Sequence, residues 1–225
     1  MRRTKLASDH FKSGATIISG ALVALEEVSP TDIEKSIARY SQGYLALRAL
    51  IRDRTDPRDE MQLLAAAHAV YGWMPTILKK IDNLLQMSNF VLGVKGLSFA
   101  DARPIVERAA TPGPGSVFFS LNNSVVGTSK LLHFLLPDLF PIWDSRIARL
   151  FDFKNSSHNR PPAYFSYFEL LHQWRESGGA LSQKLFDKMQ VHVPRNDPLS
   201  DLRLIEYALF LASVSNFGGE ATDPE

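Results

Sequence analysis

The stretch NNSVVGTSKLLHFLLPDLFPIWDSRIARL, residues 122–150, carries most of what this sequence says about its fold. It opens with a turn over Asn122–Gly127, because asparagine and glycine are typical turn residues. The apolar segment Thr128–Leu136 then predicts a helix, which ends before a proline that cannot continue it. Another helix is expected to begin at Asp144 or Ser145, since both residue types cap helix N-termini.

Helical periodicity extends over most of the remaining chain. The predicted helices are Thr31–Asp53, Asp56–Tyr71, Thr76–Val91, Phe99–Ala110, Ser116–Leu121, Ala163–Glu176, Leu181–Met189 and Leu199–Val214. Only Val191–Val193 resembles a strand. We therefore predict an all-α fold, in which one domain of two helical lobes, about 14–110 and 116–216, precedes a disordered tail at 217–225.

The composition excludes several classes of protein. The chain has 225 residues, of which 45% are hydrophobic and 22% charged, as in ordinary globular domains rather than disordered ones. It has no cysteine, which excludes disulfides, cysteine nucleophiles, thiolate zinc sites and iron–sulfur clusters. The six histidines show no metal-ligand spacing such as His-Glu-x-x-His. We expect neither a metal nor another cofactor.

The same sequence gives expectations about location and charge. Its apolar runs are shorter than the roughly 20 residues that cross a bilayer, and the basic start is followed by polar residues rather than an apolar signal core. We expect a cytoplasmic monomer with no membrane partner. The net charge of +1 is too close to neutral to indicate nucleic-acid binding by itself, so a DNA contact would need a local patch.

The turn before Thr128 is a candidate phosphate-binding element. The short helix Ser116–Leu121, the turn with Val125–Gly127, and the next helix together predict a helix-hairpin-helix element. Turn amides and the free donors at the start of a helix would point at one place, which suits a phosphate. Such contacts hold a DNA backbone without reading its sequence. The candidate DNA-binding residues here are Asn122, Asn123, Gly127, Thr128 and Ser129.

The segment Pro141–Arg146 resembles a part of the helix-hairpin-helix DNA glycosylases. In that part of the family, a few apolar residues lead to an aspartate at the N-terminus of a helix. The resemblance implies that Asp144 is the catalytic carboxylate. Removal of a base from deoxyribose develops positive charge on the sugar, which a fixed carboxylate stabilises. The helix start favours the ionised form of that carboxylate. The resemblance thus implies a DNA N-glycosylase whose partner is double-stranded DNA containing a damaged or modified base.

A lysine near the predicted turn is similar to one that some members of that family use. Gly127–Lys130 resembles the Gly-Thr-Lys start of their second hairpin helix, which implies that Lys130 is an amine that attacks the sugar and gives AP-lyase activity. Lys130 stands one place later after the glycine and 14 positions before Asp144, a shorter spacing than in the family. The cluster loop of four cysteines found in some branches is absent, which leaves the cluster-free branches.

Several neighbouring residues have two interpretations. Trp143, His133 and Tyr164 are candidates for a slot that holds a flipped base, or they belong to the core. Arg146 and Arg149 could neutralise phosphates or lie on a solvated helix face. Asp144 itself could be a helix cap alone.

The alternative function is a non-catalytic helical module that binds DNA or a protein. A glycosylase could act on a damaged base in the host genome or on a modified base in phage DNA. The first substrate would make it an enzyme of DNA repair, and the second an enzyme of antiviral defence.

Overall fold

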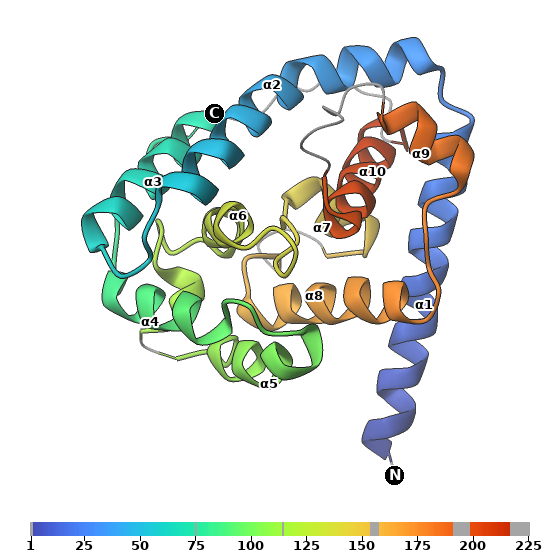
Figure 1. Cartoon of the computed structure of the whole chain (residues 1–225). Helices are drawn as coiled ribbons and strands as arrows, with labels where there is room; N and C mark the ends of the chain where they lie inside the picture. Colours follow the sequence, from blue (N-terminus) through green and yellow to red (C-terminus); the bar gives the residue numbers. More distant parts are fainter. Residues whose placement is uncertain (1, 75, 114, 154–157, 191–198, 217–225) are drawn as a thin grey trace.

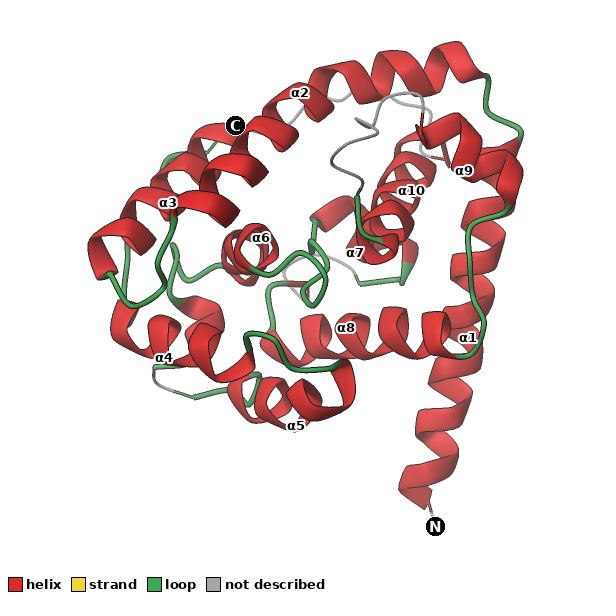
Figure 2. Cartoon of the chain, in the orientation of Figure 1, coloured by secondary structure: helices red, strands yellow, loops and turns green. Residues whose placement is uncertain are grey.

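The computed structural model describes residues 2–74, 76–113, 115–153, 158–190 and 199–216, and these are mainly helical (Figures 1 and 2). The α-helices are α1 (Arg2–Glu26), α2 (Pro30–Arg54), α3 (Glu60–Trp73), α4 (Leu84–Val94), α5 (Phe99–Ala109), α6 (Val125–Leu135), α7 (Ser145–Leu150), α8 (Pro161–Glu176), α9 (Gln183–Gln190) and α10 (Asp201–Asn216), with a 3-10 turn η1 at Val117–Phe119. The all-α prediction is confirmed. The predicted tail at 217–225 and the strand-like Val191–Val193 lie outside the described residues.

Helix α6 lies near the middle of the molecule, and the other helices surround it (Figure 1). It packs against α2, α3 and η1, whereas α1 runs along α10 and also contacts α8 and α9. The longest helices, α1 and α2, have 25 residues each. None of the helices in the described ranges combines the length and the apolarity that crossing a membrane requires.

Helix α6 is capped at its start and anchored in the core. Ser124 is the N-cap, and its Oγ accepts a hydrogen bond from the Gly127 amide at 3.2 Å. Leu131, Leu132 and Phe134 on the same helix are fully buried, which anchors it in the core. The helix therefore begins at Val125, three residues earlier than predicted, and the predicted turn residues 125–127 form its first turn. Only residues 122–124 remain as a turn ahead of it.

Two buried apolar clusters form the core. The larger one joins Ile18 of α1 with Leu209 of α10 and with side chains from α4, α5 and α8. The smaller one joins Tyr71 of α3 with Leu131 of α6 and Tyr44 of α2. Each cluster combines residues from both predicted lobes. The apolar contacts thus cross the boundary expected near residues 111–115.

The prediction of a helix over Thr76–Val91 is wrong in its first half, because α4 begins only at Leu84. The residues before it pair with the turn that precedes α6 instead. Ile81 forms an isolated antiparallel bridge with Leu121. The side chain of Asn122 accepts hydrogen bonds from the Lys79 and Lys80 amides, both at 2.8 Å. These contacts with a distant segment satisfy backbone groups that a helix would otherwise pair locally.

A candidate active-site cavity

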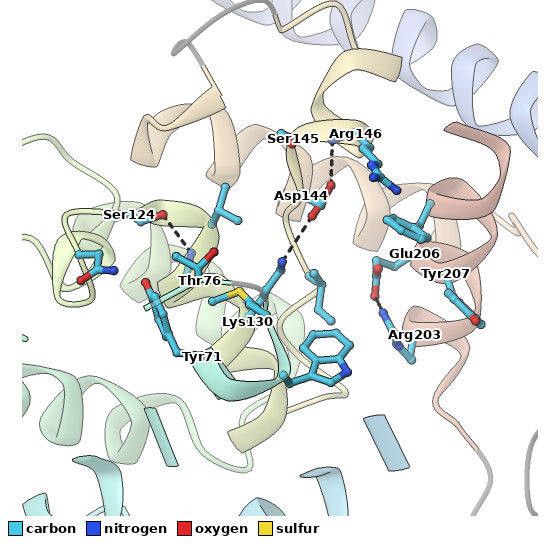
Figure 3. Close-up of a pocket in the computed structure, with 17 residues that line it drawn as sticks. Tyr71, Thr76, Ser124, Lys130, Asp144, Ser145, Arg146, Arg203, Glu206 and Tyr207 are labelled. Atoms are coloured by element: carbon cyan, nitrogen blue, oxygen red, sulfur yellow. Dashed lines mark hydrogen bonds and ion pairs between the residues drawn. The ribbon is translucent and has the colours of Figure 1, made fainter. Parts of the chain in front are cut away.

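A cavity of about 330 Å³ lies between α3, α6, α10 and the start of α7 (Figure 3). Its wall includes Tyr71 and Trp73 from α3, Lys130 from α6, Asp144 and Arg146 at α7, and Arg203, Glu206, Tyr207 and Phe210 from α10. Segments far apart in the sequence therefore supply one concave site with both charged and aromatic side chains. A site of this kind is the usual location of ligand binding in a globular protein.

Asp144 caps helix α7 and also faces this cavity. Its Oδ1 accepts a hydrogen bond from the Arg146 amide at 2.8 Å, and α7 begins at the next residue, as the sequence predicted. Its Oδ2 lies 3.4 Å from the Nζ of Lys130. One carboxylate oxygen of Asp144 thus caps the helix, and the other forms an ion pair with Lys130 on the cavity wall.

Lys130 completes this ion pair from the middle of α6. Its side chain is only 12% exposed, and that of Asp144 is 20% exposed, so the pair is partly shielded from water. The Nζ also lies 5.9 Å from the centre of the Trp73 ring, where the face of the indole favours a cation. The structure therefore brings together the two residues predicted to be catalytic (Figure 3).

A buried backbone connection fixes the position of Asp144 relative to α6. The Trp143 amide donates to the Oγ of Ser129 at 3.2 Å, and the indole Nε1 of Trp143 donates to the His158 carbonyl at 2.8 Å. Both Ser129 and Trp143 are fully buried. Because these groups have paired hydrogen bonds in the core, the segment leading to Asp144 has a defined register against the helix that carries Lys130.

The three residues predicted to form a base slot do not line the cavity. Trp143, His133 and Tyr164 are all fully buried in the core. The Nδ1 of His133 donates to the Phe140 carbonyl and its Nε2 accepts from the Tyr44 hydroxyl, each at 2.7 Å. The structure thus gives these side chains packing roles beneath the site.

Their burial also affects titration and hydrogen bonding. Burial, with the nearby charge of Arg203, holds the pKa of His133 well below its usual range. The hydroxyl of Tyr164 donates to the Pro141 carbonyl at 3.2 Å, which ties α8 to the segment before Asp144.

The aromatic side chains on the cavity wall are ones that the sequence did not single out. Trp73, Tyr207 and Phe210 line the cavity, and Tyr71 closes it beside α6. Burial raises the pKa of the Tyr71 hydroxyl to about 12, and this hydroxyl donates to the Leu121 carbonyl at 3.3 Å. No local motif marks Trp73 or Phe210, because their positions depend on how α3 and α10 meet α6.

The predicted phosphate-binding turn is largely occupied by internal contacts. The amide of Val125 donates to the Oδ1 of Asn159 at 2.8 Å, and the amide of Gly127 is bonded to Ser124. Gly127, Thr128 and Ser129 are buried. A Cβ at Gly127 would overlap the hydroxyl of Tyr71, so this glycine allows a close helix contact.

The remaining predicted DNA-binding residues lie at or near the surface. Asn122 and Asn123 both have left-handed backbone conformations, with φ of 52° and 51°, and Asn123 is exposed. Arg146 lines the cavity with its Cζ 5.7 Å from the centre of the Phe210 ring. Arg149 is exposed one turn further along α7. These polar groups lie around the turn and the helix that flank the cavity.

The wall formed by α10 contains a buried ion pair between Arg203 and Glu206. Their side chains are 6% and 2% exposed. Burial raises the pKa of Glu206; Arg203 opposes this rise, while the charge of Asp144 adds to it. The charge of Lys130 acts in the opposite direction to that of Asp144, so both members of the neighbouring ion pair lie close enough to Glu206 to affect it.

Comparison of the chain with protein-family models, curated proteins and solved structures found no match in any of the three. Within the described ranges, no group of three or more His, Asp or Glu side chains gathers where it could hold a metal ion. The chemistry of the site must therefore be inferred from its own side chains.

Proposed function

We propose that the protein is a DNA glycosylase that hydrolyses the N-glycosidic bond of a damaged or modified base flipped out of duplex DNA into the cavity. The observation that carries this proposal is the Lys130–Asp144 ion pair at the head of α7, facing a cavity with aromatic walls. The resemblance of residues 141–146 to the aspartate segment of helix-hairpin-helix glycosylases gives it independent support.

Charge separation in the reaction matches the two members of the pair. As the bond between the sugar and the base breaks, positive charge develops on the sugar and negative charge on the departing base. The Asp144 carboxylate would stabilise the sugar cation and orient the attacking water. The Lys130 ammonium would stabilise the departing base, which then takes a proton. Water adds its hydroxyl to C1′, so the products are an abasic site and the free base.

The aromatic lining suits a flipped base. Enzymes that act on a base inside a duplex must extrude it and hold it against aromatic or apolar side chains. Trp73, Tyr207 and Phe210 offer such surfaces on the wall of the cavity that the ion pair also lines. Arg146 and Arg149 on α7 would meet the phosphates on either side of the extruded nucleotide.

The experiment is a release assay on a panel of duplexes. Oligonucleotides carrying oxidised, alkylated, deaminated, hydroxymethylated or glucosylated bases are incubated with the full chain, and released bases are identified by mass spectrometry. We expect one class to release its base while unmodified duplex does not. Release of an ordinary lesion would indicate repair, and release of a phage-type base would indicate defence. Binding without release from any duplex would contradict the proposal and favour the non-catalytic module.

A further inference from the structure

The Arg203–Glu206 pair in the cavity wall has features that a purely structural ion pair does not need. Burial of two charges costs free energy, and replacement of such a pair by apolar side chains is often neutral or stabilising. Both residues line the same cavity as Asp144. A charged pair retained on the wall of a ligand-sized cavity therefore points to a ligand that uses it.

The guanidinium of Arg203 is held firmly in position. Its Cζ lies 4.2 Å from the centre of the Tyr44 ring and 5.0 Å from that of Tyr207, so aromatic rings contact it from two helices. Its Nη1 donates to Glu206. Its Nε is buried and has no hydrogen-bond partner among the described residues. A buried donor without a partner is costly, so this arginine has hydrogen-bonding capacity that contacts within the protein leave unused.

The two groups offer complementary hydrogen bonding side by side. A carboxylate only accepts hydrogen bonds, and a guanidinium only donates them. A ligand edge that fits this wall must place a donor toward Glu206 and an acceptor toward Arg203. Cytosine and adenine have such an edge, with an amino group beside an unprotonated ring nitrogen. Uracil and hypoxanthine have the reverse order, an oxo group beside an N–H.

We propose that the Arg203–Glu206 pair reads the base in the cavity, and that the substrate is a modified base with a cytosine- or adenine-type edge. This rests on the proposed function and narrows its substrate class. Glu206 accepts from the exocyclic amino group, and Arg203 donates to the ring nitrogen. In an oxo base at the same place, the oxo oxygen would face the Glu206 carboxylate, so that two acceptors meet. The ring N–H would face the Arg203 guanidinium, so that two donors meet.

The test uses pairs of duplexes that differ only by exchange of an amino for an oxo group. They carry cytosine or uracil with the same 5-substituent, or adenine or hypoxanthine. Two quantities are measured: single-turnover base release by the unaltered chain, and equilibrium binding by the Asp144→Asn variant. We expect the amino member of a pair to be favoured at least about tenfold, the discrimination typical of a lost hydrogen bond to a charged group.

Glu206→Gln is the decisive substitution, tested alone for release and together with Asp144→Asn for binding. Glutamine keeps the volume and still accepts from Arg203, but its amide can turn to donate to an oxo group. The preference should therefore fall to about equality. Asp201→Asn, on an exposed residue in the first turn of α10, should keep it. A double variant, Arg203→Met with Glu206→Leu, removes both charges without leaving one unpaired, and should also lose the preference.

These outcomes separate the two proposals. Equal treatment of amino and oxo members by the unaltered chain would overturn the reading role, as would a preference that survives in both Glu206 variants. If those variants lose activity toward the amino and the oxo duplex by the same factor, the ratio between the two is unchanged. That result would also overturn the reading role and leave the pair a structural role. If no duplex releases its base but the binding preference for the amino member persists, the proposed glycosylase activity is refuted. The proposal that Arg203 and Glu206 recognise the base edge would then still hold.

Discussion

The Nζ of Lys130 and the Oδ2 of Asp144 lie 3.4 Å apart on one wall of the cavity. One residue comes from the buried central helix and the other caps a neighbouring helix, so the core fixes their separation. If this pair matches the charges that develop as a glycosidic bond breaks, removal of either member should lower the rate of that step more than it lowers stability.

Lys130→Met tests the cationic half of the pair. Methionine keeps an apolar chain beside Trp73 but cannot stabilise a departing base. We predict that single-turnover base release falls about 100-fold, the size of effect seen when one such donor is removed. The control is Lys184→Met, on an exposed lysine of α9 paired with Glu27, which should leave the rate unchanged. An unchanged rate in Lys130→Met would remove Lys130 from the mechanism.

Borohydride trapping tests whether Lys130 attacks the sugar. Its Nζ donates to the Asp144 carboxylate and lies over the Trp73 ring, and a nitrogen held in these contacts is not free to attack the sugar. We predict that borohydride traps no covalent adduct between the protein and the DNA during base release. A trapped adduct that disappears in Lys130→Met would show instead that Lys130 is an amine nucleophile and that the enzyme also nicks the strand.

Gly127→Ala tests whether this glycine serves helix packing. The new Cβ would overlap the Tyr71 hydroxyl, which is itself bonded inside the core. We predict a loss of about 1–3 kcal/mol in the free energy of unfolding, as for other overpacked sites, measured by chemical denaturation. Gly72→Ala is the matched control, because nothing lies within 4 Å of its Cβ. It should be neutral or stabilising. A neutral Gly127→Ala would contradict the packing role.

The sequence predicted the fold class and the place of Asp144, because those features depend on local rules. Asp144 immediately precedes the short helix α7, and an aspartate at that position is a typical N-cap. The predicted start of α6 is three residues too late, because Asn122, Asn123 and Gly127 are typical turn residues and the prediction places the valines between them in the turn. Ser124 is the N-cap of this helix, and serine just before an apolar helical segment is the local signal that marks its true start.

The other half of the cavity could not be predicted from the sequence. Arg203 and Glu206 form an ordinary i, i+3 pair on a largely apolar helix, and only the packing of α10 places them on the same cavity wall as Asp144. Trp143 was adjacent to Asp144 in sequence, yet successive residues in an extended segment point in opposite directions. The tryptophan therefore enters the core while the aspartate faces the cavity.

Two buried histidines should make stability depend on pH. Burial lowers the pKa of His172 to about 4 and that of His133 well below 6.5. As pH falls below 6.5, these histidines take up protons in the unfolded chain but stay neutral in the folded one. Stability is therefore fully present above about pH 6.5 and is lost as pH falls toward 4, by up to about 1.4 kcal/mol per pH unit for each histidine.

The measurement is the free energy of unfolding between pH 4.5 and 7.5 in the unaltered chain and in His172→Gln. The variant removes one titrating group whose Nε2 donates to the Leu139 carbonyl. Its dependence on pH should be shallower over the same window, whatever its stability at neutral pH. Parallel curves for the two proteins would contradict the assignment of His172 as a neutral buried group.

The most direct test of the central claim is single-turnover base release by Asp144→Asn compared with Asp59→Asn. Asparagine caps helices about as well as aspartate, so both variants should keep their folds, and Asp59 caps α3 in the same way that Asp144 caps α7. We predict that Asp144→Asn loses at least about 100-fold in rate, because the sugar cation loses its carboxylate, while Asp59→Asn keeps the unaltered rate. Release by Asp144→Asn at the unaltered rate would contradict the proposed mechanism.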